Sequence, residues 1–137
     1  MEKDFLKKKE EAKKKSILVI EDEEMLAEMY KDKFEYEGFT VFSAYDGEEG
    51  LKMAFKKKPD IILLDVLLPK KEGVDVLKEI RESGKWGKEL PVVMFSNLES
   101  SDYILEAISK YNPSYYFMKT NIELNEVVKK IKELISF

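Results

Sequence analysis

Short apolar runs alternate with amphipathic segments along the chain from Ser16 onward. Three of these runs are continuous and apolar throughout, which is typical of strands that are covered on both faces of a sheet. Two others alternate or are rich in aromatic residues, which favours strands that are less deeply buried. The strands predicted in this way span 17–20, 39–43, 61–64, 92–95 and 115–118.

Between the predicted strands, apolar residues recur at the three- and four-residue spacing of amphipathic helices. The first helix is expected to end at Gly38, a frequent C-terminal residue, while Asp46 and Asn121 are placed to cap the second and the fifth. The apolar stripes of the five helices lie within 26–34, 51–55, 74–80, 104–111 and 127–135. This alternation predicts an α/β protein: a doubly wound five-stranded parallel sheet, flanked by five helices and built through right-handed crossovers.

The first fifteen residues form a separate, highly charged segment. They contain seven lysines and four acidic residues, with Phe5 and Leu6 as the large apolar residues beyond Met1. We expect a charged N-terminal extension at 1–15 and a single domain at 16–137. The start lacks the apolar stretch of a signal peptide, and no apolar run approaches the ~18 residues of a membrane span. We therefore expect a cytoplasmic protein without membrane insertion.

The composition narrows the chemistry that this chain can perform. Of its 137 residues, 44% are hydrophobic and 38% are charged, a balance that is typical of a folded domain. It contains no cysteine and no histidine, which excludes disulfides, thiolate nucleophiles, histidine-ligated metals and Ser/His/Asp hydrolysis. The formal net charge of −4 argues against direct binding to DNA. Any chemistry must therefore use carboxylates, hydroxyls or lysines.

Polar residues stand where four of the predicted strands end. The first strand is followed by the acidic run 21–23, the third by Asp65, the fourth by Ser96 and the fifth by Lys119. Ligands of open α/β sheets bind outside the carboxyl ends of the strands. Each residue alone has an ordinary structural explanation, except that Asp65 lies between two apolar runs, where an acid is costly without a partner. The set at four strand ends favours a functional site.

The acids of this set point to a divalent cation. If Glu21, Asp22 and Asp65 meet at one edge, each close pair of carboxylates costs about 4 kcal/mol at an effective dielectric near 20. Oxygen ligands without cysteine or histidine favour Mg²⁺ over a transition metal. Together with the ammonium of Lys119 and the hydroxyl of Ser96, such a site suits a phosphoryl group, for which a carboxylate can be the nucleophile.

These residues, in this order, make the chain resemble the receiver domain of two-component response regulators, from Ser16 to about Phe137. The stretches that carry the resemblance are ILVIEDEE, PDIILLDVLLPKKEG, PVVMFSN and YYFMK. The resemblance implies a flavodoxin-like fold with strand order 2-1-3-4-5. It also implies that Asp65 accepts a phosphoryl group from the phosphohistidine of a sensor histidine kinase or of a histidine phosphotransfer protein. Because this chain has no histidine, the donor must be another molecule.

The resemblance also assigns the remaining site residues by position. It implies that Mg²⁺ is held by the side chains of Glu21, Asp22 and Asp65 and by the backbone carbonyl of Leu67. Ser96 and Lys119 match the hydroxyl and the lysine that bind the phosphoryl group. Ser96 and Tyr116 match the pair that switches conformation. Such a protein is a phosphoacceptor switch that catalyses its own phosphorylation and dephosphorylation, and not an enzyme in the ordinary sense.

Signal output is expected to occur by docking to another protein. The chain ends with the fifth predicted helix, which leaves no segment for an output domain of its own. In the family the usual docking surface consists of the fourth helix, the fifth strand and the fifth helix. These correspond here to 100–111, 115–118 and 122–137.

Several positions depart from the family pattern. Glu21 replaces the commoner aspartate and adds one methylene to a metal ligand. Thr120 stands where the family has proline, and a cis bond before a non-proline residue costs ~3 kcal/mol, which disfavours the family's cis peptide here. Asn97 is larger than the usual residue and narrows access to Asp65. Lys71 places a charge in a loop that is often apolar.

The lifetime of the phosphorylated state is expected to be long. In the family, the positions two residues beyond the phosphoacceptor and two beyond the hydroxyl residue flank the path of the attacking water. These positions are Leu67 and Leu98, and neither side chain can hydrogen-bond to a water. A poorly positioned nucleophile costs orders of magnitude in rate.

Two alternative functions remain open at this point. The first is a receiver-like scaffold that uses the same surface without phosphorylation, which the intact Asp22, Asp65, Ser96 and Lys119 disfavour. The second is a metal-dependent phosphatase of the aspartyl-phosphate kind. Such enzymes normally need a second carboxylate two residues beyond the nucleophile, where this chain has Leu67.

Overall fold

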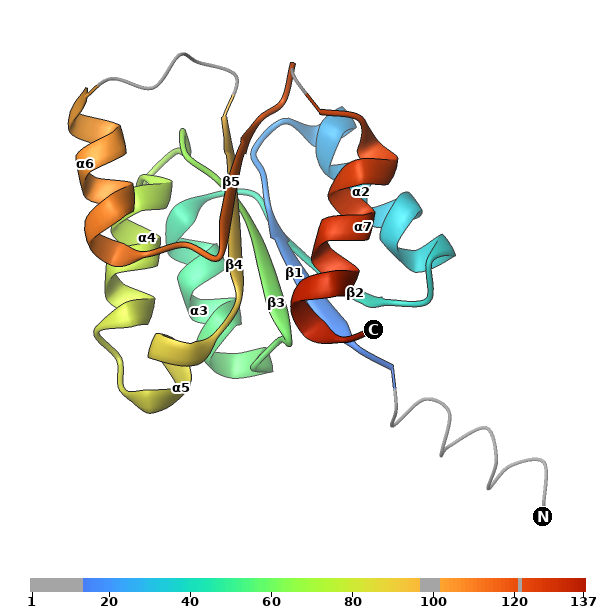
Figure 1. Cartoon of the computed structure of the whole chain (residues 1–137), viewed down its shortest axis with the longest axis horizontal. Coiled ribbons are helices and arrows are strands. Elements are labelled where there is room, and N and C mark those ends of the chain that lie inside the picture. Colours follow the sequence, from blue (N-terminus) through green and yellow to red (C-terminus); the bar gives the residue numbers. More distant parts are fainter. Residues whose placement is uncertain (1–13, 97–101, 121) are drawn as a thin grey trace.

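One parallel sheet with helices on both faces forms the core of the protein (Figure 1). The computed structural model describes residues 14–96, 102–120 and 122–137. Its strands lie in the order β2-β1-β3-β4-β5, as predicted for a doubly wound, flavodoxin-like fold. They are β1 (Ser16–Ile20), β2 (Thr40–Ala44), β3 (Ile61–Asp65), β4 (Val92–Ser96) and β5 (Tyr115–Met118).

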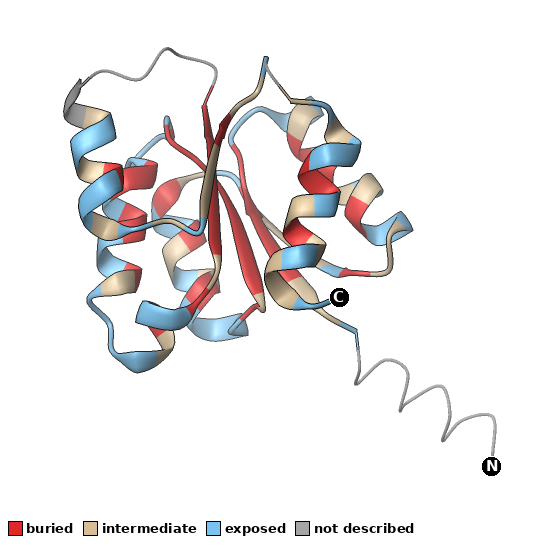
Figure 2. Ribbon diagram, in the orientation of Figure 1, coloured by how far each residue is buried: buried red, intermediate tan, exposed pale blue. Residues whose placement is uncertain are grey.

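The burial of the strands follows their place in the sheet (Figure 2). Every residue of the central strands β3 and β4 is buried, which agrees with their continuous apolar sequences. The edge strands β2 and β5 are mostly half-buried. The expectation of three deeply buried strands and two less buried ones is therefore confirmed.

The helices divide into two layers, one on each face of the sheet (Figure 1). On one face, α2 and α7 pack over a core that includes Phe34 and Val128. On the other face, α3, α4, α5 and α6 pack over a core that includes Leu77 and Ile108. The helices are α2 (Glu24–Tyr36), α3 (Gly47–Lys57), α4 (Gly73–Arg81), α5 (Lys85–Glu89), α6 (Asp102–Tyr111) and α7 (Leu124–Ile135). None of the helices in the described ranges is long and apolar enough to cross a membrane.

Most of the predicted helix ends are correct. Gly38 follows α2 with a φ of 97°, a backbone conformation that favours glycine. The carboxylate of Asp46 accepts a hydrogen bond from the backbone N–H of Glu49 at 2.8 Å, so it caps α3 as expected. The predicted start of the last helix is wrong, because α7 begins at Leu124 with Glu123 as its N-cap. Asn121, the expected cap, lies outside the described residues.

The described ranges contain six helices, one more than the sequence predicts. The additional helix, α5, is a single turn between α4 and β4. Gly84 precedes it with a φ of 125° and turns the chain sharply after α4. A five-residue helix cannot display the repeated apolar spacing that identifies longer helices, so the periodicity did not reveal it.

The loop between β3 and α4 is held by close contacts of its backbone with the start of α3 and with the end of β3. The N–H of Gly47 donates to the carbonyl of Pro69 at 3.2 Å, which joins the start of α3 to this loop. A Cβ at Gly73 would lie 2.1 Å from the carbonyl oxygen of Asp65. Glycine is therefore required at the start of α4 for the loop to fold back onto the end of β3.

Arg81, the single arginine of the chain, joins three helices near the amino ends of the strands. Its guanidinium donates hydrogen bonds to the carbonyls of Gly87 and Leu90, both at 2.7 Å, and to those of Tyr111 and Asn112 at 3.1 and 3.2 Å. Burial lowers the pKa of this guanidinium from its usual value. The planar group therefore joins the ends of α4, α5 and α6 at one point.

Replacing Arg81 with alanine is expected to lower the free energy of unfolding by about 3 kcal/mol, because several carbonyls lose a charged donor at once. Urea denaturation measures this change. Lys78→Ala, on the exposed side of the same helix, is the matched control and should change stability by less than about 0.5 kcal/mol. Equal losses in the two variants would contradict the assigned role of Arg81.

Candidate functional site

The carboxyl ends of neighbouring strands bring the predicted acids together. Glu21 and Asp22 directly follow β1, and Asp65 is the last residue of β3, the strand beside β1 in the sheet. One carboxylate oxygen from each of the three residues lies within 4.8 Å of the others. The cluster therefore follows from the crossover topology, since 44 residues of chain separate Asp65 from the first acid.

The three acids differ in how far they are exposed. The side chains of Glu21 and Asp65 are buried, with relative exposures of 1% and 6%, whereas Asp22 is exposed. A carboxylate oxygen of Glu21 accepts the N–H of Glu23 at 3.2 Å, and one of Asp65 accepts the N–H of Leu67, also at 3.2 Å. These backbone donors orient the two buried carboxylates toward the same edge of the sheet.

Lys119 supplies the positive charge that lies between the two buried acids. Its ammonium nitrogen is 3.3 Å from a carboxylate oxygen of Glu21 and 3.3 Å from one of Asp65. The backbone N–H of Lys119 donates to the carbonyl of Ser96 at 2.9 Å, which fixes the chain where β5 ends. Only 10% of the lysine side chain is exposed, so the ion pairs are shielded from water. The site thus contains one largely shielded ammonium for two buried carboxylates and one exposed carboxylate.

Burial and a close neighbour alter the ionisation of Glu21. Burial is the largest cause, and together with a hydrogen bond and the negative charge of Asp65 it raises the pKa of Glu21 from 4.5 to about 8. Lys119 opposes this rise. A single ammonium is therefore insufficient to keep both buried carboxylates ionised at neutral pH.

The donor set fits a Mg²⁺ ion. A shallow pocket of about 400 Å³ is lined by Glu21, Asp22, Glu23, Asp65, Leu67 and Lys119. Its acidic residues offer carboxylate oxygens, and its lining contains no histidine or cysteine, which suits the preference of Mg²⁺ for oxygen ligands. The exposed Asp22 leaves one side of the acid cluster open to solvent, so waters can complete the coordination. The excess of carboxylates over cations gives an ion an electrostatic reason to bind.

The two predicted switch residues lie on the adjacent strands β4 and β5. Ser96 is buried and ends β4, one residue beyond the position that pairs with Asp65 in the sheet. Tyr116 is half-buried on β5 and packs against the core beneath α3, α4 and α6. Asn97 and Leu98, which the sequence analysis placed at the mouth of the site, lie outside the described residues. The bond between Lys119 and Thr120 is trans, as no cis peptide occurs within the described ranges.

Two aromatic residues near the site were not predicted from the sequence. Phe95 reads as an ordinary core residue of an apolar strand, but the ammonium of Lys119 lies over its ring. Tyr30 reads as part of a helical stripe, but burial and the charges of Glu21 and Asp65 raise the pKa of its phenol. For Phe95 the sequence did contain one signal. Side chains alternate along a strand, so Phe95 lies on the opposite face of the sheet from the hydroxyl of Ser96.

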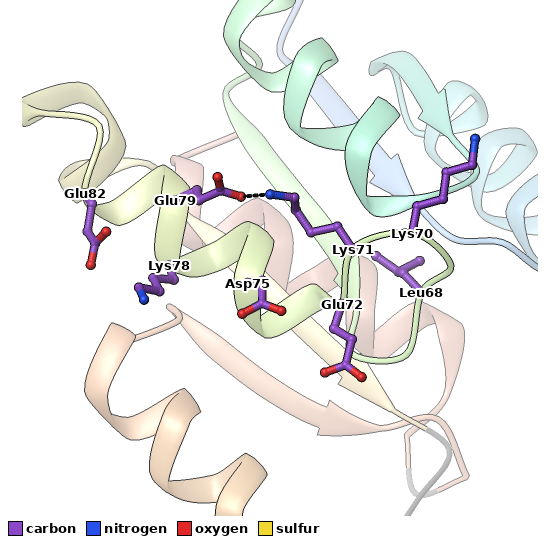
Figure 3. A pocket seen from close by; sticks show the side chains of 8 residues that line it. All are labelled: Leu68, Lys70, Lys71, Glu72, Asp75, Lys78, Glu79 and Glu82. Carbon is purple, nitrogen blue, oxygen red and sulfur yellow. Dashed lines mark hydrogen bonds and ion pairs between the residues drawn. The ribbon is translucent and has the colours of Figure 1, made fainter.

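A larger hollow elsewhere on the surface does not involve the acid cluster (Figure 3). It has a volume of about 780 Å³, lies along α4, and is lined mostly by charged side chains. In Figure 3 the side chains of Lys71 and Glu79 form an ion pair beside it, and Lys70 extends away toward α3. Mixed exposed charges without a buried polar group do not define a ligand there, so the candidate site is the smaller pocket.

Stability of the metal-free protein should fall as the pH rises from about 4.5 to about 8. The folded state holds the Glu21 proton more tightly than the unfolded state does, so its stabilising effect is complete below pH 4.5 and is lost as Glu21 ionises in the fold. The expected slope is on the order of 1 kcal/mol per pH unit at most. Urea denaturation in EDTA measures it.

Glu21→Gln provides the control for this pH dependence, because glutamine resembles the protonated acid at every pH. Most of the slope should be absent from this variant between pH 5 and 8. An unchanged slope in Glu21→Gln would show that another group causes it.

Comparison with known proteins agrees with this geometry. A family model for the response regulator receiver domain matches residues 17–132. The Francisella response regulator 1452 receiver domain is similar, with 27% identity, a TM-score of 0.78, and coverage of 89% of this chain and 97% of that one. Two further structures share the fold. A CheY-like receiver domain protein from Methanospirillum hungatei JF-1 has 24% identity and a TM-score of 0.82, with coverage of 90% of this chain and 94% of that one. The chemotaxis response regulator CheY4 of Vibrio cholerae has 22% identity and a TM-score of 0.78, with coverage of 88% of this chain and 98% of that one. The chain therefore belongs to the response regulator receiver domain family.

Proposed function

We propose that the protein is a phosphoacceptor switch in which Asp65 takes a phosphoryl group from a phosphohistidine. The donor is a sensor histidine kinase or a histidine phosphotransfer protein. The observation that carries the proposal is the cluster of Glu21, Asp22 and Asp65 against the ammonium of Lys119, in a member of the receiver family. The chain itself has no histidine that could act as the donor.

The transfer forms an acyl phosphate on Asp65. One carboxylate oxygen attacks the phosphorus, an O–P bond forms, and the P–N bond to the donor's imidazole breaks with its electron pair passing to the ring nitrogen. The N–H of Leu67 holds one oxygen of Asp65 and thereby orients the carboxylate. The low exposure of Asp65 limits the approach of water to the product.

The acids around Asp65 form the proposed metal site. Glu21, Asp22 and Asp65 would hold Mg²⁺ through their side chains, and Leu67 would contribute its backbone carbonyl. When bound, the ion supplies positive charge for the oxygens of the transferring phosphoryl group. Glu21 must give up its proton to serve as a ligand, so its raised pKa couples metal binding to proton release.

Lys119 and Ser96 would bind the phosphoryl group from the other side. The ammonium of Lys119 already lies 3.3 Å from Asp65 and can neutralise an oxygen of the acyl phosphate. Ser96 stands at the end of the strand next to β3, from which its hydroxyl can donate to the same group. We assign both residues to phosphoryl binding.

Output would follow from a shift of Ser96 and Tyr116 toward the modified site. Tyr116 belongs to β5, and the predicted docking surface consists of 100–111, 115–118 and 122–137, of which residues 100 and 101 lie outside the described ranges. Movement of this tyrosine would alter the surface of β5 between α6 and α7. A protein that binds this surface would be the target, with 16–137 acting as the receiver domain and 1–15 as a charged extension.

Phosphorylation by acetyl phosphate or phosphoramidate should occur at one residue, Asp65, and should need Mg²⁺. Intact-mass spectrometry with peptide mapping detects the added group. Asp65→Asn should remain unmodified, whereas the exposed Asp32→Asn on α2 is a control that should be labelled like the wild type. Labelling of Asp65→Asn, or undiminished labelling in EDTA, would refute the site assignment. Absence of labelling in the wild type would favour the scaffold alternative.

The phosphorylated protein should lose its phosphoryl group slowly. Leu67 lines the pocket beside Asp65 with 44% of its surface exposed, and its side chain offers no hydrogen bond to a water molecule. Leu67→Asn should accelerate the decay several-fold by orienting water, while Leu67→Met, which stays apolar, should leave the rate close to that of the wild type. Decay is followed by intact mass after removal of the phosphodonor. Equal decay rates in all three proteins would exclude Leu67 as a determinant of the lifetime.

A further inference from the structure

The ring of Phe95 forms a platform for the ammonium of Lys119. The nitrogen lies 4.6 Å from the ring centroid, within the distance at which a cation is attracted to the face of an aromatic ring. The lysine side chain is 10% exposed and the phenylalanine is fully buried. Because water is largely excluded, the attraction is stronger here than it would be at an exposed site.

The sheet and two further rings fix the position of Phe95. Phe95 pairs directly with Asp65 in the β3–β4 register, and its carbonyl accepts the N–H of Val66 at 3.0 Å. Its ring contacts Tyr30 edge-on at 5.5 Å and stacks on Phe117 at 5.7 Å. A ring enclosed in this way has little freedom to turn, so the surface that it presents to Lys119 is preorganised.

The carboxylates alone hold the ammonium loosely. The ammonium nitrogen lies 3.4 and 3.3 Å from the two carboxylate oxygens of Glu21 and 3.3 Å from one oxygen of Asp65. These distances exceed the 2.7–2.9 Å that is usual for a charged N–H···O hydrogen bond. Lysine has a flexible stem that does not by itself fix its charge. The ring therefore supplies a third contact, one that does not depend on the ionisation of the acids.

We propose that Phe95 is a positioning residue for phosphoryl binding, acting through Lys119. The ring holds the ammonium beside Asp65 before the phosphoryl group arrives, so that less ordering is needed when it binds. The identity of the bound group rests on the proposed function, whereas the contact between the ring and the lysine does not. A purely structural role, in which Phe95 only fills the core, is the competing explanation.

Graded fluorination separates these explanations, because fluorine withdraws the negative charge from the ring face with little change in ring size. Phe95 is replaced site-specifically by 4-fluoro-, 3,5-difluoro- and pentafluorophenylalanine. The affinity for beryllofluoride in the presence of Mg²⁺ is then measured by titration. We expect affinity to fall stepwise with fluorine content, on the order of tenfold across the series. The same replacements at Phe34, a fully buried ring of the same core that stacks on Tyr30, are the matched control and should leave the affinity unchanged.

A second readout tests the contact without any phosphoryl analogue. The side-chain methylene next to the Lys119 ammonium should show an upfield NMR shift caused by the ring, lost in Phe95→Leu and retained in Phe34→Leu. Failure of the wild type to bind beryllofluoride would refute the proposed function and leave this NMR comparison to decide the role of Phe95. A flat affinity series at Phe95, an equal decline at Phe34, or an NMR shift that survives in Phe95→Leu would overturn the inference.

Discussion

Two buried carboxylates that share one ammonium group are the constraint on which the functional end of this molecule depends. Glu21 and Asp65 lie at the ends of adjacent strands, and the crossover topology gives them no freedom to separate. Lys119, 98 positions away from Glu21 in the sequence, reaches both of them. The resulting excess of negative charge attracts cations, and the rest of the fold holds the carboxylates in position.

The sheet holds the carboxylates rigidly because its centre is apolar and buried on both faces. Strands β3 and β4 are entirely buried, and the loop after β3 is fastened by glycines that permit backbone contact at Gly47 and Gly73. At the amino end of the strands, Arg81 joins the ends of α4, α5 and α6, three of the four helices on one face. The candidate site thus lies at one end of the strands, and the hydrogen bonds of Arg81 lie at the other.

The sequence predicted the strands and the acid cluster because both depend on local signals combined with a simple topological rule. Continuous apolar runs identified β1, β3 and β4, and parallel alignment then required their polar ends to meet. Features without periodicity escaped prediction: α5 is too short to repeat a pattern, and α7 begins three residues after the expected cap. The contact of Phe95 with Lys119 also escaped, because a phenylalanine in an apolar strand is indistinguishable from core until the lysine is placed in space.

A map of amide NMR shifts on addition of Mg²⁺ and then beryllofluoride to the wild-type protein tests most directly whether the acid cluster binds the metal and Asp65 takes the phosphoryl group. The Mg²⁺-induced shifts should cluster at the carboxyl ends of β1 and β3. Beryllofluoride should then extend them to Ser96, Lys119 and β5. Saturable shifts centred instead on the charged hollow along α4, or the absence of any saturable shift around Asp65, would contradict this assignment of the site.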